Sequence, residues 1–337
     1  MRTSILGSIA LLTVALAPAW ADHHITTVVD GLDNPAGVAI QPETGDLFVS
    51  DSGASRVIRV VDGKAQDVIT GFPVDVYGKG PMYNIGPLGL LFLDKDTLVV
   101  GGGGLLDGAE LLRVYKVPAA GEPAITADKM AASFNLAEND DVKGEGNFYG
   151  LAATGSHVYV TCNGDDTKGW VARATIADGT LTGFERFLAT KEATEVDAPV
   201  AATLSPRGEL VIGQMGEITV PGDGLLTFYN AHTGKLLLNL PTGLSDITAL
   251  AYSPKGHPDG QLYATDFNWT NTKEGGLFQL IRKEDDGKQS IEAKKIESLD
   301  KPTAMVFGAD GSLYITVIGT GEGDAKGGKL LKIEPGL

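Results

Sequence analysis

The feature that most constrains the fold is a short apolar strand, preceded by a turn, that recurs six times along the chain. Its copies are residues 45–49, 96–100, 156–160, 208–212, 260–264 and 311–315. Each copy carries a Leu or Val at its third position, and these anchor residues lie 51, 60, 52, 52 and 51 residues apart. A fixed period of this length is typical of proteins built by repeating one supersecondary unit.

Each repeat contains more than the anchor strand. A small residue opens another apolar strand 8 to 13 residues before each anchor, at Gly37, Gly89, Gly150, Ala201, Ala249 and Ala304. A third strand follows each anchor, at residues 56–60, 110–114, 170–174, 225–228, 277–280 and 330–333, and a weaker fourth usually comes next. Small residues suit places where backbones crowd together. The pattern therefore indicates strands that meet around a central axis.

Six units of about four strands predict an all-β protein, a six-bladed β-propeller of four-stranded antiparallel blades. The last unit lacks its outer strand, because the chain ends soon after residue 333. Residues 25–29 form a strand that belongs to no unit. We expect this N-terminal strand to complete the last blade, close the ring and hide both sheet edges. The one helical candidate of note is residues 127–136.

The first 21 residues have the pattern of a secretory signal peptide. Arg2 precedes an apolar run at residues 5–17, and the small residues Ala19 and Ala21 stand at the third and first positions before a predicted cut. The run is shorter than the ~20 residues of a membrane span. We therefore predict cleavage after residue 21 and a single propeller domain at 22–337, located in the periplasm or outside the cell.

Charge and cysteine content narrow the classes of partner. The chain carries 27 Lys and Arg against 43 Asp and Glu, a net charge of −16, which repels nucleic acid and anionic lipid surfaces. Its single cysteine excludes a disulfide scaffold and a multi-thiolate zinc site. We expect a monomer without a membrane span or a nucleic acid partner, which binds a small molecule or a protein at the propeller rim.

Two further patterns carry no catalytic prediction. Cys162 ends one of the anchor strands without a convincing basic partner, and we expect a small buried cysteine rather than a nucleophile. Four consecutive glycines at residues 101–104 follow another anchor strand. They lack the Lys and the Ser or Thr of a phosphate-binding loop, so we expect a flexible part of the rim.

Residues 31–60 resemble an NHL repeat, and the later units resemble degenerate versions of it. The chain is similar to exported members of the superfamily of senescence marker protein-type gluconolactonases, strictosidine synthase-like proteins and soluble quinoprotein sugar dehydrogenases. For the lactonases, this resemblance implies an axial divalent cation held by Glu, Asn and Asp. The chain departs from that pattern, because Asp33, Asn34 and Pro35 open the first strand without a Glu. No Asn directly precedes a small opening residue either.

Antiparallel pairing places the start of the first strand and the end of the second at the same rim of each blade. The polar residues at these positions form the predicted ligand rim: Asn34, Asn147, Asp197, Asp246, Asp266 and Asp300. Oxygen ligands suit a hard cation such as calcium, with Asp246 and Asp266 as the candidate metal ligands. The alternative is structural, because an Asp at a strand end can cap a turn or pair with a nearby Arg, as Asp51 could with Arg56.

Three functions remain open from the sequence. The first is a binding or scaffold module that acts through its axial rim. The second is a divalent-cation-dependent hydrolase of lactones or sugar-derived esters, in which the metal polarises a carbonyl and an Asp moves a proton. The third is an oxidoreductase like the quinoprotein sugar dehydrogenases, although no convincing cluster of Arg, Lys and His is present to hold a quinone carboxylate.

Overall fold

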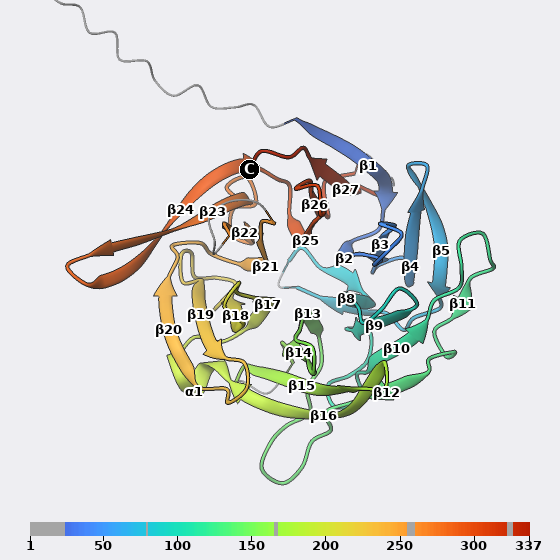
Figure 1. The fold of residues 1–337 in the computed structure, drawn as a ribbon, viewed down its shortest axis with the longest axis horizontal. Helices are drawn as coiled ribbons and strands as arrows, with labels where there is room; N and C mark the ends of the chain where they lie inside the picture. Colours follow the sequence, from blue (N-terminus) through green and yellow to red (C-terminus); the bar gives the residue numbers. More distant parts are fainter. Residues whose placement is uncertain (1–23, 79, 165–167, 255–259, 322–325) are drawn as a thin grey trace, which may run out of the picture.

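The protein is a ring of six β-sheets around one axis (Figure 1). The computed structural model describes residues 24–78, 80–164, 168–254, 260–321 and 326–337. The ring confirms the predicted six-bladed β-propeller of mostly four-stranded antiparallel blades. The predicted signal peptide, residues 1–21, lies outside the described residues.

Each blade runs outward from its first strand, which lies nearest the axis (Figure 1). Blade 1 contains β2 (Pro35–Ile40), β3 (Leu47–Asp51), β4 (Arg56–Val61) and β5 (Lys64–Thr70). Blade 2 contains β8 (Pro87–Phe92), β9 (Thr97–Gly102), β10 (Leu112–Lys116) and β12 (Ala132–Phe134). Blade 3 contains β13 (Phe148–Ala153), β14 (His157–Cys162), β15 (Trp170–Ala177) and β16 (Thr180–Ala189). Blade 4 contains β17 (Pro199–Leu204), β18 (Glu209–Gln214), β19 (Leu225–Asn230) and β20 (Leu236–Pro241). Blade 5 contains β21 (Ile247–Tyr252), β22 (Leu262–Asp266), β23 (Gly276–Asp285) and β24 (Lys288–Ser298). Blade 6 contains β25 (Pro302–Phe307), β26 (Leu313–Val317), β27 (Gly328–Ile333) and β1 (Ile25–Leu32).

The first strands pack closely around a narrow axial channel. All six small residues predicted to open these strands line it: Gly37, Gly89, Gly150, Ala201, Ala249 and Ala304. A Cβ on Gly37 would overlap the carbonyl oxygen of Leu88 in the next blade. A Cβ on Gly89 would overlap that of Tyr149 in the blade after it. Glycine is therefore required here by the close approach of neighbouring blades.

Hydroxyl groups join one blade to the next near the axis. Ser50 Oγ in blade 1 donates to the Leu88 carbonyl of blade 2 at 2.6 Å. Thr161 Oγ1 in blade 3 donates to the Val200 carbonyl of blade 4 at 2.8 Å. Thr303 makes the same kind of contact across the point of ring closure, to the Pro35 carbonyl of blade 1 at 2.7 Å. These buried bonds satisfy carbonyl groups that the sheets leave free at the blade boundaries.

The ring is closed by the two ends of the described chain, as the sequence predicts. β1 pairs antiparallel with β27, with Ile25 opposite Ile333 and Leu32 opposite Gly328. Val29 and Leu32 of β1 are buried in the core beside Leu330 of β27. The sixth blade is thus completed by the N-terminal strand, which covers an edge that would otherwise be open.

Two local predictions are wrong. Residues 127–136 contain no helix but the strand β12, which pairs with β10 and completes blade 2, so tertiary pairing overrides local propensity. The glycines at 101–104 are not a loose rim, because they are packed against other backbone. A Cβ on Gly101 would overlap the Phe148 carbonyl, and one on Gly104 would overlap the Pro73 carbonyl.

Helix is almost absent from the fold. Within the described ranges, the one α-helix is α1 (Thr190–Thr194), a single turn between blades 3 and 4. In that part of the chain, no helix has the length and apolar character needed to cross a membrane.

Deleting residues 25–29 tests the closing strand. The deletion removes the side-chain burial of Val29 and exposes the edge of β27, so we expect the melting temperature to fall by roughly 10 °C. Differential scanning calorimetry measures the change. Thr27→Ser, at an exposed position of the same strand, is the control and should melt like the parent chain. An unchanged melting temperature for the deletion would show that the ring does not depend on β1.

Candidate functional site

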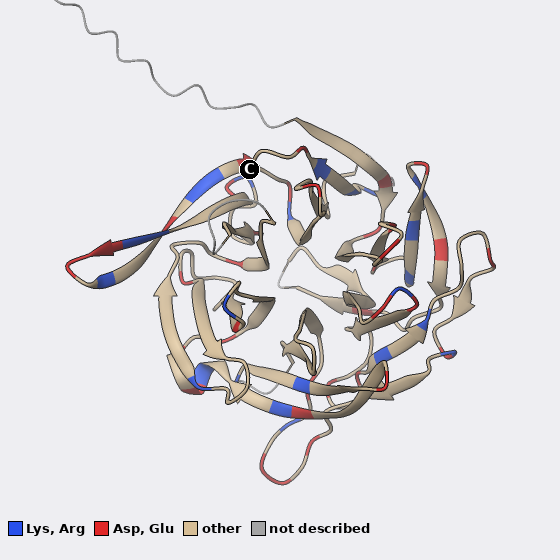
Figure 2. Ribbon diagram, in the orientation of Figure 1, with Lys and Arg blue, Asp and Glu red and all other residues tan. Residues whose placement is uncertain are grey.

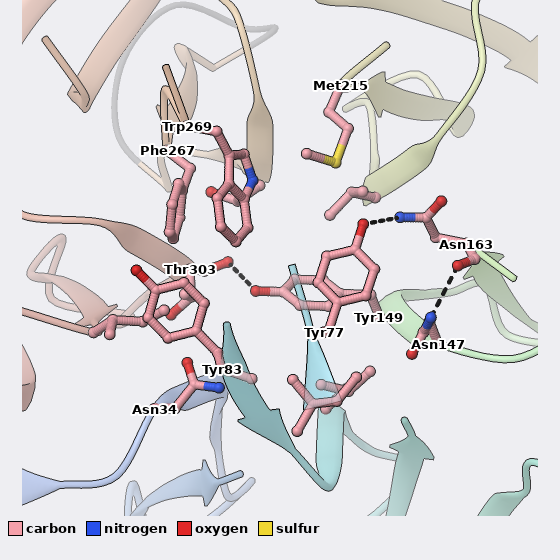
Figure 3. A pocket seen from close by; sticks show the side chains of 16 residues that line it. Asn34, Tyr77, Tyr83, Asn147, Tyr149, Asn163, Met215, Phe267, Trp269 and Thr303 are labelled. Atoms are coloured by element: carbon pink, nitrogen blue, oxygen red, sulfur yellow. Dashed lines mark hydrogen bonds between the residues drawn. The ribbon is translucent and has the colours of Figure 1, made fainter. Parts of the chain in front are cut away.

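A pocket lies on the propeller axis, at the rim where the first strands begin. Sixteen residues line it (Figure 3). Every blade contributes to the lining, for example Asn34, Leu88, Tyr149, Val200, Phe267 and Thr303 in chain order. The hairpin formed by β6 (Asp75–Tyr77) and β7 (Tyr83–Ile85) adds three more residues from the connection between blades 1 and 2. In Figure 1 this cyan segment reaches over the centre of the ring.

Aromatic rings form one side of the pocket. Phe267 and Trp269, which directly follow β22, are stacked with their ring centroids 4.4 Å apart. Tyr83 of the hairpin meets Trp269 at 5.5 Å, with 59° between the ring planes. Tyr77 meets the same indole at 6.4 Å and 62°. The hairpin is therefore held over the axis by aromatic contacts with blade 5.

The polar groups of the lining are neutral. Tyr149 donates its hydroxyl to the Thr303 carbonyl at 3.0 Å. The amide nitrogen Nδ2 of Asn163 donates to the Tyr77 hydroxyl at 3.2 Å, and that of Asn147 donates to the Asn163 carbonyl at 3.0 Å (Figure 3). Burial raises the pKa of Tyr77 and of Tyr149, so both phenols stay protonated at neutral pH.

Among the residues that the structure describes, no Lys, Arg, His, Asp or Glu lines the pocket. Figure 2 shows the same separation, with the coloured charged residues mostly on outer strands and loops. About 80 Å³ of the pocket is open to the centres of water-sized molecules, which is room for several waters. The lining therefore suits a small, largely apolar molecule better than an anion.

Two of the six predicted rim residues, Asn34 and Asn147, line this pocket. Both have a left-handed backbone, with φ of 52° and 48°, which Asn tolerates better than most residues. The described structure does not bring the four aspartates into the lining. Asp197 pairs with Lys191 at 3.1 Å, and Asp300 pairs with Lys301 at 2.8 Å.

Asp266 binds backbone groups of its own blade. Its Oδ1 accepts the Asp246 and Asn268 N–H groups at 2.7 and 3.1 Å, and its Oδ2 accepts the Ser245 N–H at 3.1 Å. Asp51 has the same position in blade 1, where it accepts the Asp33 N–H at 2.6 Å and pairs with Arg56 at 2.7 Å. The pairing of Asp51 with Arg56 considered from sequence is therefore confirmed, and Asp266 has a structural role of the same kind through its backbone N–H contacts.

Asp246 is the most perturbed acid near the pocket. Its Oδ2 accepts the backbone N–H of Trp269 at 2.7 Å, so the carboxylate helps to hold the indole in place. Its Oδ1 is buried and has no hydrogen-bond partner among the described residues. Burial raises the pKa of Asp246 to about 7, and the neighbouring carboxylates of Asp266 and Asp223 act in the same direction.

The donor set for a metal ion is sparse. Among the residues that the structure describes, no group of three or more His, Cys, Asp and Glu side chains is placed to hold a metal. Both Asp266 oxygens already accept backbone N–H groups, which leaves Asp246 Oδ1 as the uncommitted carboxylate oxygen of the two candidate ligands. Calcium normally takes six to eight oxygen ligands. Cys162 is buried in the core of blade 3, as expected, and burial raises the pKa of its thiol well above the ordinary value.

The aromatic residues of the pocket were not found from sequence. Tyr77 and Tyr83 lie in a hairpin inserted between two repeats, where no periodic signal applies. The run Tyr-Gly-Lys-Gly-Pro at residues 77–81, between short apolar segments, is the local signal that could have indicated a hairpin. Phe267 and Trp269 follow a predicted rim position by one and three residues, so a search for aromatics at the rim would have found them.

Solved structures are similar to the chain over nearly all of its length. No model of a protein family matches the sequence, and no curated protein matches it. A gluconolactonase from Xanthomonas campestris is 14% identical, with 94% of this chain and 90% of that chain covered and a TM-score of 0.55. A soluble aldose sugar dehydrogenase from Escherichia coli, in its apo-form, is 13% identical, with 93% and 100% covered and a TM-score of 0.59.

A calcium-binding regucalcin from Agrobacterium tumefaciens is 13% identical, with 93% of each chain covered and a TM-score of 0.53. At these identities the matches show a shared fold. The resemblance to gluconolactonase-like propellers expected from sequence is thereby confirmed for the architecture.

Asp246→Asn tests the buried carboxyl. The pKa of Asp246 is raised in the folded state, so the folded protein retains a proton that the unfolded chain loses between about pH 4 and 7. The free energy of unfolding therefore falls as pH rises through this range. We expect the variant to lose that part of the pH dependence and to be more stable than the parent at pH 8, by at most roughly 4 kcal/mol. Urea unfolding between pH 4.5 and 8 measures the difference.

The control is Asp30→Asn, at an exposed position of β1, which should follow the parent curve. Other buried acids, such as Asp51 and Glu110, also have raised pKa values, so only the difference between parent and Asp246→Asn is informative. Parallel curves for these two proteins would show that Asp246 does not titrate in this range.

Proposed function

We propose that the protein is a binding module that takes a small organic molecule into its axial pocket. One observation carries the proposal: six blades and an inserted hairpin together build a neutral, aromatic pocket on the axis. Pockets lined mainly by apolar and aromatic side chains, with a few placed polar groups, are the usual form of small-molecule sites.

The side chains in the lining favour binding over catalysis. The described lining residues supply amides, hydroxyls and rings, and none of them carries a carboxylate, imidazole, amine or thiol. The phenols of Tyr77 and Tyr149 have raised pKa values, which makes them poor bases at neutral pH. A ligand can thus be held and oriented there without a group that would transfer its protons readily.

A cation-assisted hydrolase is the second candidate, and Asp246 favours it. Its pKa of about 7 matches the range in which a general base works at neutral pH. The structural neighbours include proteins named as a gluconolactonase and a calcium-binding regucalcin. This function would require a divalent cation near Asp246 Oδ1, with further oxygen ligands from groups other than the carboxylate of Asp266. A quinoprotein-like dehydrogenase has less support, because no Lys, Arg or His is found in the described part of the lining.

A thermal-shift panel separates the first two functions. The panel contains small aromatic compounds, substituted ammonium ions, sugars and lactones, and separately calcium, magnesium, manganese and zinc. We expect an organic compound to stabilise the fold by mass action, by about 2.7 kcal/mol at 100 times its dissociation constant. Met215→Trp, which fills the pocket, should abolish the shift, whereas the volume-conserving Met215→Leu should retain it.

Stabilisation by a metal alone, lost in Asp246→Asn, together with lactone hydrolysis that chelation stops, would replace the binding module by the hydrolase. If none of the organic compounds stabilises the parent chain, the proposed binding function fails for the chemical classes tested.

We also propose that the protein is exported, with residues 1–21 removed. Support comes from the charged start, the apolar run and the small residues before the predicted cut. N-terminal sequencing of the mature protein should then begin at Asp22. Ala19→Arg should block cleavage and leave the longer chain in the cell, whereas Ile5→Leu should be processed normally. A mature protein that still starts at Met1 would contradict the proposal.

A further inference from the structure

The rings around the axial pocket are arranged as walls rather than as one flat platform. Tyr77 and Tyr83 each meet Trp269 at a steep angle, near 60°, so their faces are turned toward different directions. Figure 3 shows the three rings and Met215 around the same space. The face of an aromatic ring is the negative part of its quadrupole, so several ring faces around one space attract a positively charged ligand there.

The asparagines add oxygen atoms to this environment. The Nδ2 groups of Asn34, Asn147 and Asn163 donate to the Asn84 carbonyl, the Asn163 carbonyl and the Tyr77 hydroxyl. Their Oδ1 atoms accept no hydrogen bond from any described residue. The NH2 group of each amide is therefore held by the protein, and its Oδ1 atom remains available to a ligand.

Two carboxylates act on the hairpin tyrosines. Burial raises the pKa of Tyr77, and the carboxylate of Asp246 raises it further. Burial likewise raises the pKa of Tyr83, with the carboxylate of Asp300 acting in the same direction. Asp300 forms an ion pair with Lys301, which is not among the lining residues, and no described Lys, Arg or His in the lining opposes this field.

We infer that the axial pocket is an aromatic cage for an organic cation, namely the head of a substituted ammonium compound. Stacked or angled rings that bind such a head without an ion pair are the common functional use of the cation–π interaction. The inference rests on the proposed binding function and names the chemical class of its ligand. The net charge of −16 favours the approach of a cation to the protein.

Alternative ligands fit the same groups less well. A carboxylate or phosphate would meet amide oxygens and ring faces, and none of the described lining residues is basic. A sugar both donates and accepts several hydrogen bonds, whereas each of the three amide nitrogens already uses one of its two N–H groups on a protein acceptor. A trimethylammonium group needs no acceptor or donor in fixed positions, and its methyl groups pack against rings and the Met215 thioether.

The test compares choline with 3,3-dimethylbutan-1-ol, a neutral molecule of the same shape. In a chain of residues 22–337, Trp170→Phe leaves Trp269 as the sole tryptophan, so its fluorescence reports on the pocket itself. At physiological salt, which screens non-specific attraction, we expect choline to bind about tenfold more tightly than the alcohol. Glucose is titrated in the same way.

A matched pair of variants assigns the preference to the cage. Tyr83→Phe retains the ring and should keep the ratio of the two affinities, whereas Tyr83→Leu removes the ring face and should reduce that ratio severalfold. Unchanged circular dichroism and cooperative melting show that both variants are folded. Met215→Trp should abolish binding of both compounds.

Each result decides the inference. Equal affinity for choline and the alcohol overturns the cage and leaves the proposed binding function intact. Tighter binding of glucose than of choline also overturns the cage and leaves the binding function intact. A preference for choline that persists in both Tyr83→Leu and Met215→Trp has the same consequence. Binding of another compound of the panel, without any binding of choline, overturns the cage alone. Only the absence of binding by every compound contradicts both proposals.

Discussion

The structure depends on the close approach of six first strands around one axis. Small residues are needed there because a side chain at Gly37 or Gly89 would overlap the carbonyl of the neighbouring blade. The same proximity lets hydroxyl groups, such as those of Ser50 and Thr161, bond directly to the next blade. The carbonyls at the blade boundaries are thereby satisfied, and the relative positions of the blades are fixed. A pocket at the end of this axis is therefore lined by residues of all six blades.

Much of the fold follows from local regularities of the sequence. The anchors at even spacing, the small residues before them and the orphan strand at residues 25–29 each correspond to a feature of the observed ring. The errors arise where a distant contact decides the local structure. Within residues 127–136, Ala132–Phe134 form a strand because the edge of β10 is free to pair with them. The glycines at 101–104 are packed because the Phe148 and Pro73 backbones approach them. Neither partner is visible from the local sequence.

The candidate site divides along the same line. Asn34 and Asn147 could be predicted because they stand at equivalent positions of the repeat, which blade geometry brings to one rim. The aspartates at related positions turn their carboxylates to backbone N–H groups or to lysines nearby in sequence. The rings that distinguish the pocket come from segments outside the repeat. The repeat therefore defines the scaffold, whereas an insertion and a loop define the chemistry of the site.

The pairing of β1 with β27 also bears on how the molecule is made. These strands are about 300 residues apart in sequence, so β1 leaves the ribosome long before its partner β27 is made. The other blades pair most of their strands between near neighbours in sequence, with low contact order; the exception is the short strand β11 (Ile125–Thr126), which pairs with β5 of blade 1. Until β27 is made, β1 has no partner strand and presents open edges, which are the part of a nascent propeller most exposed to pairing with another chain. The pairing that closes the ring thus also covers the edges most exposed to aggregation.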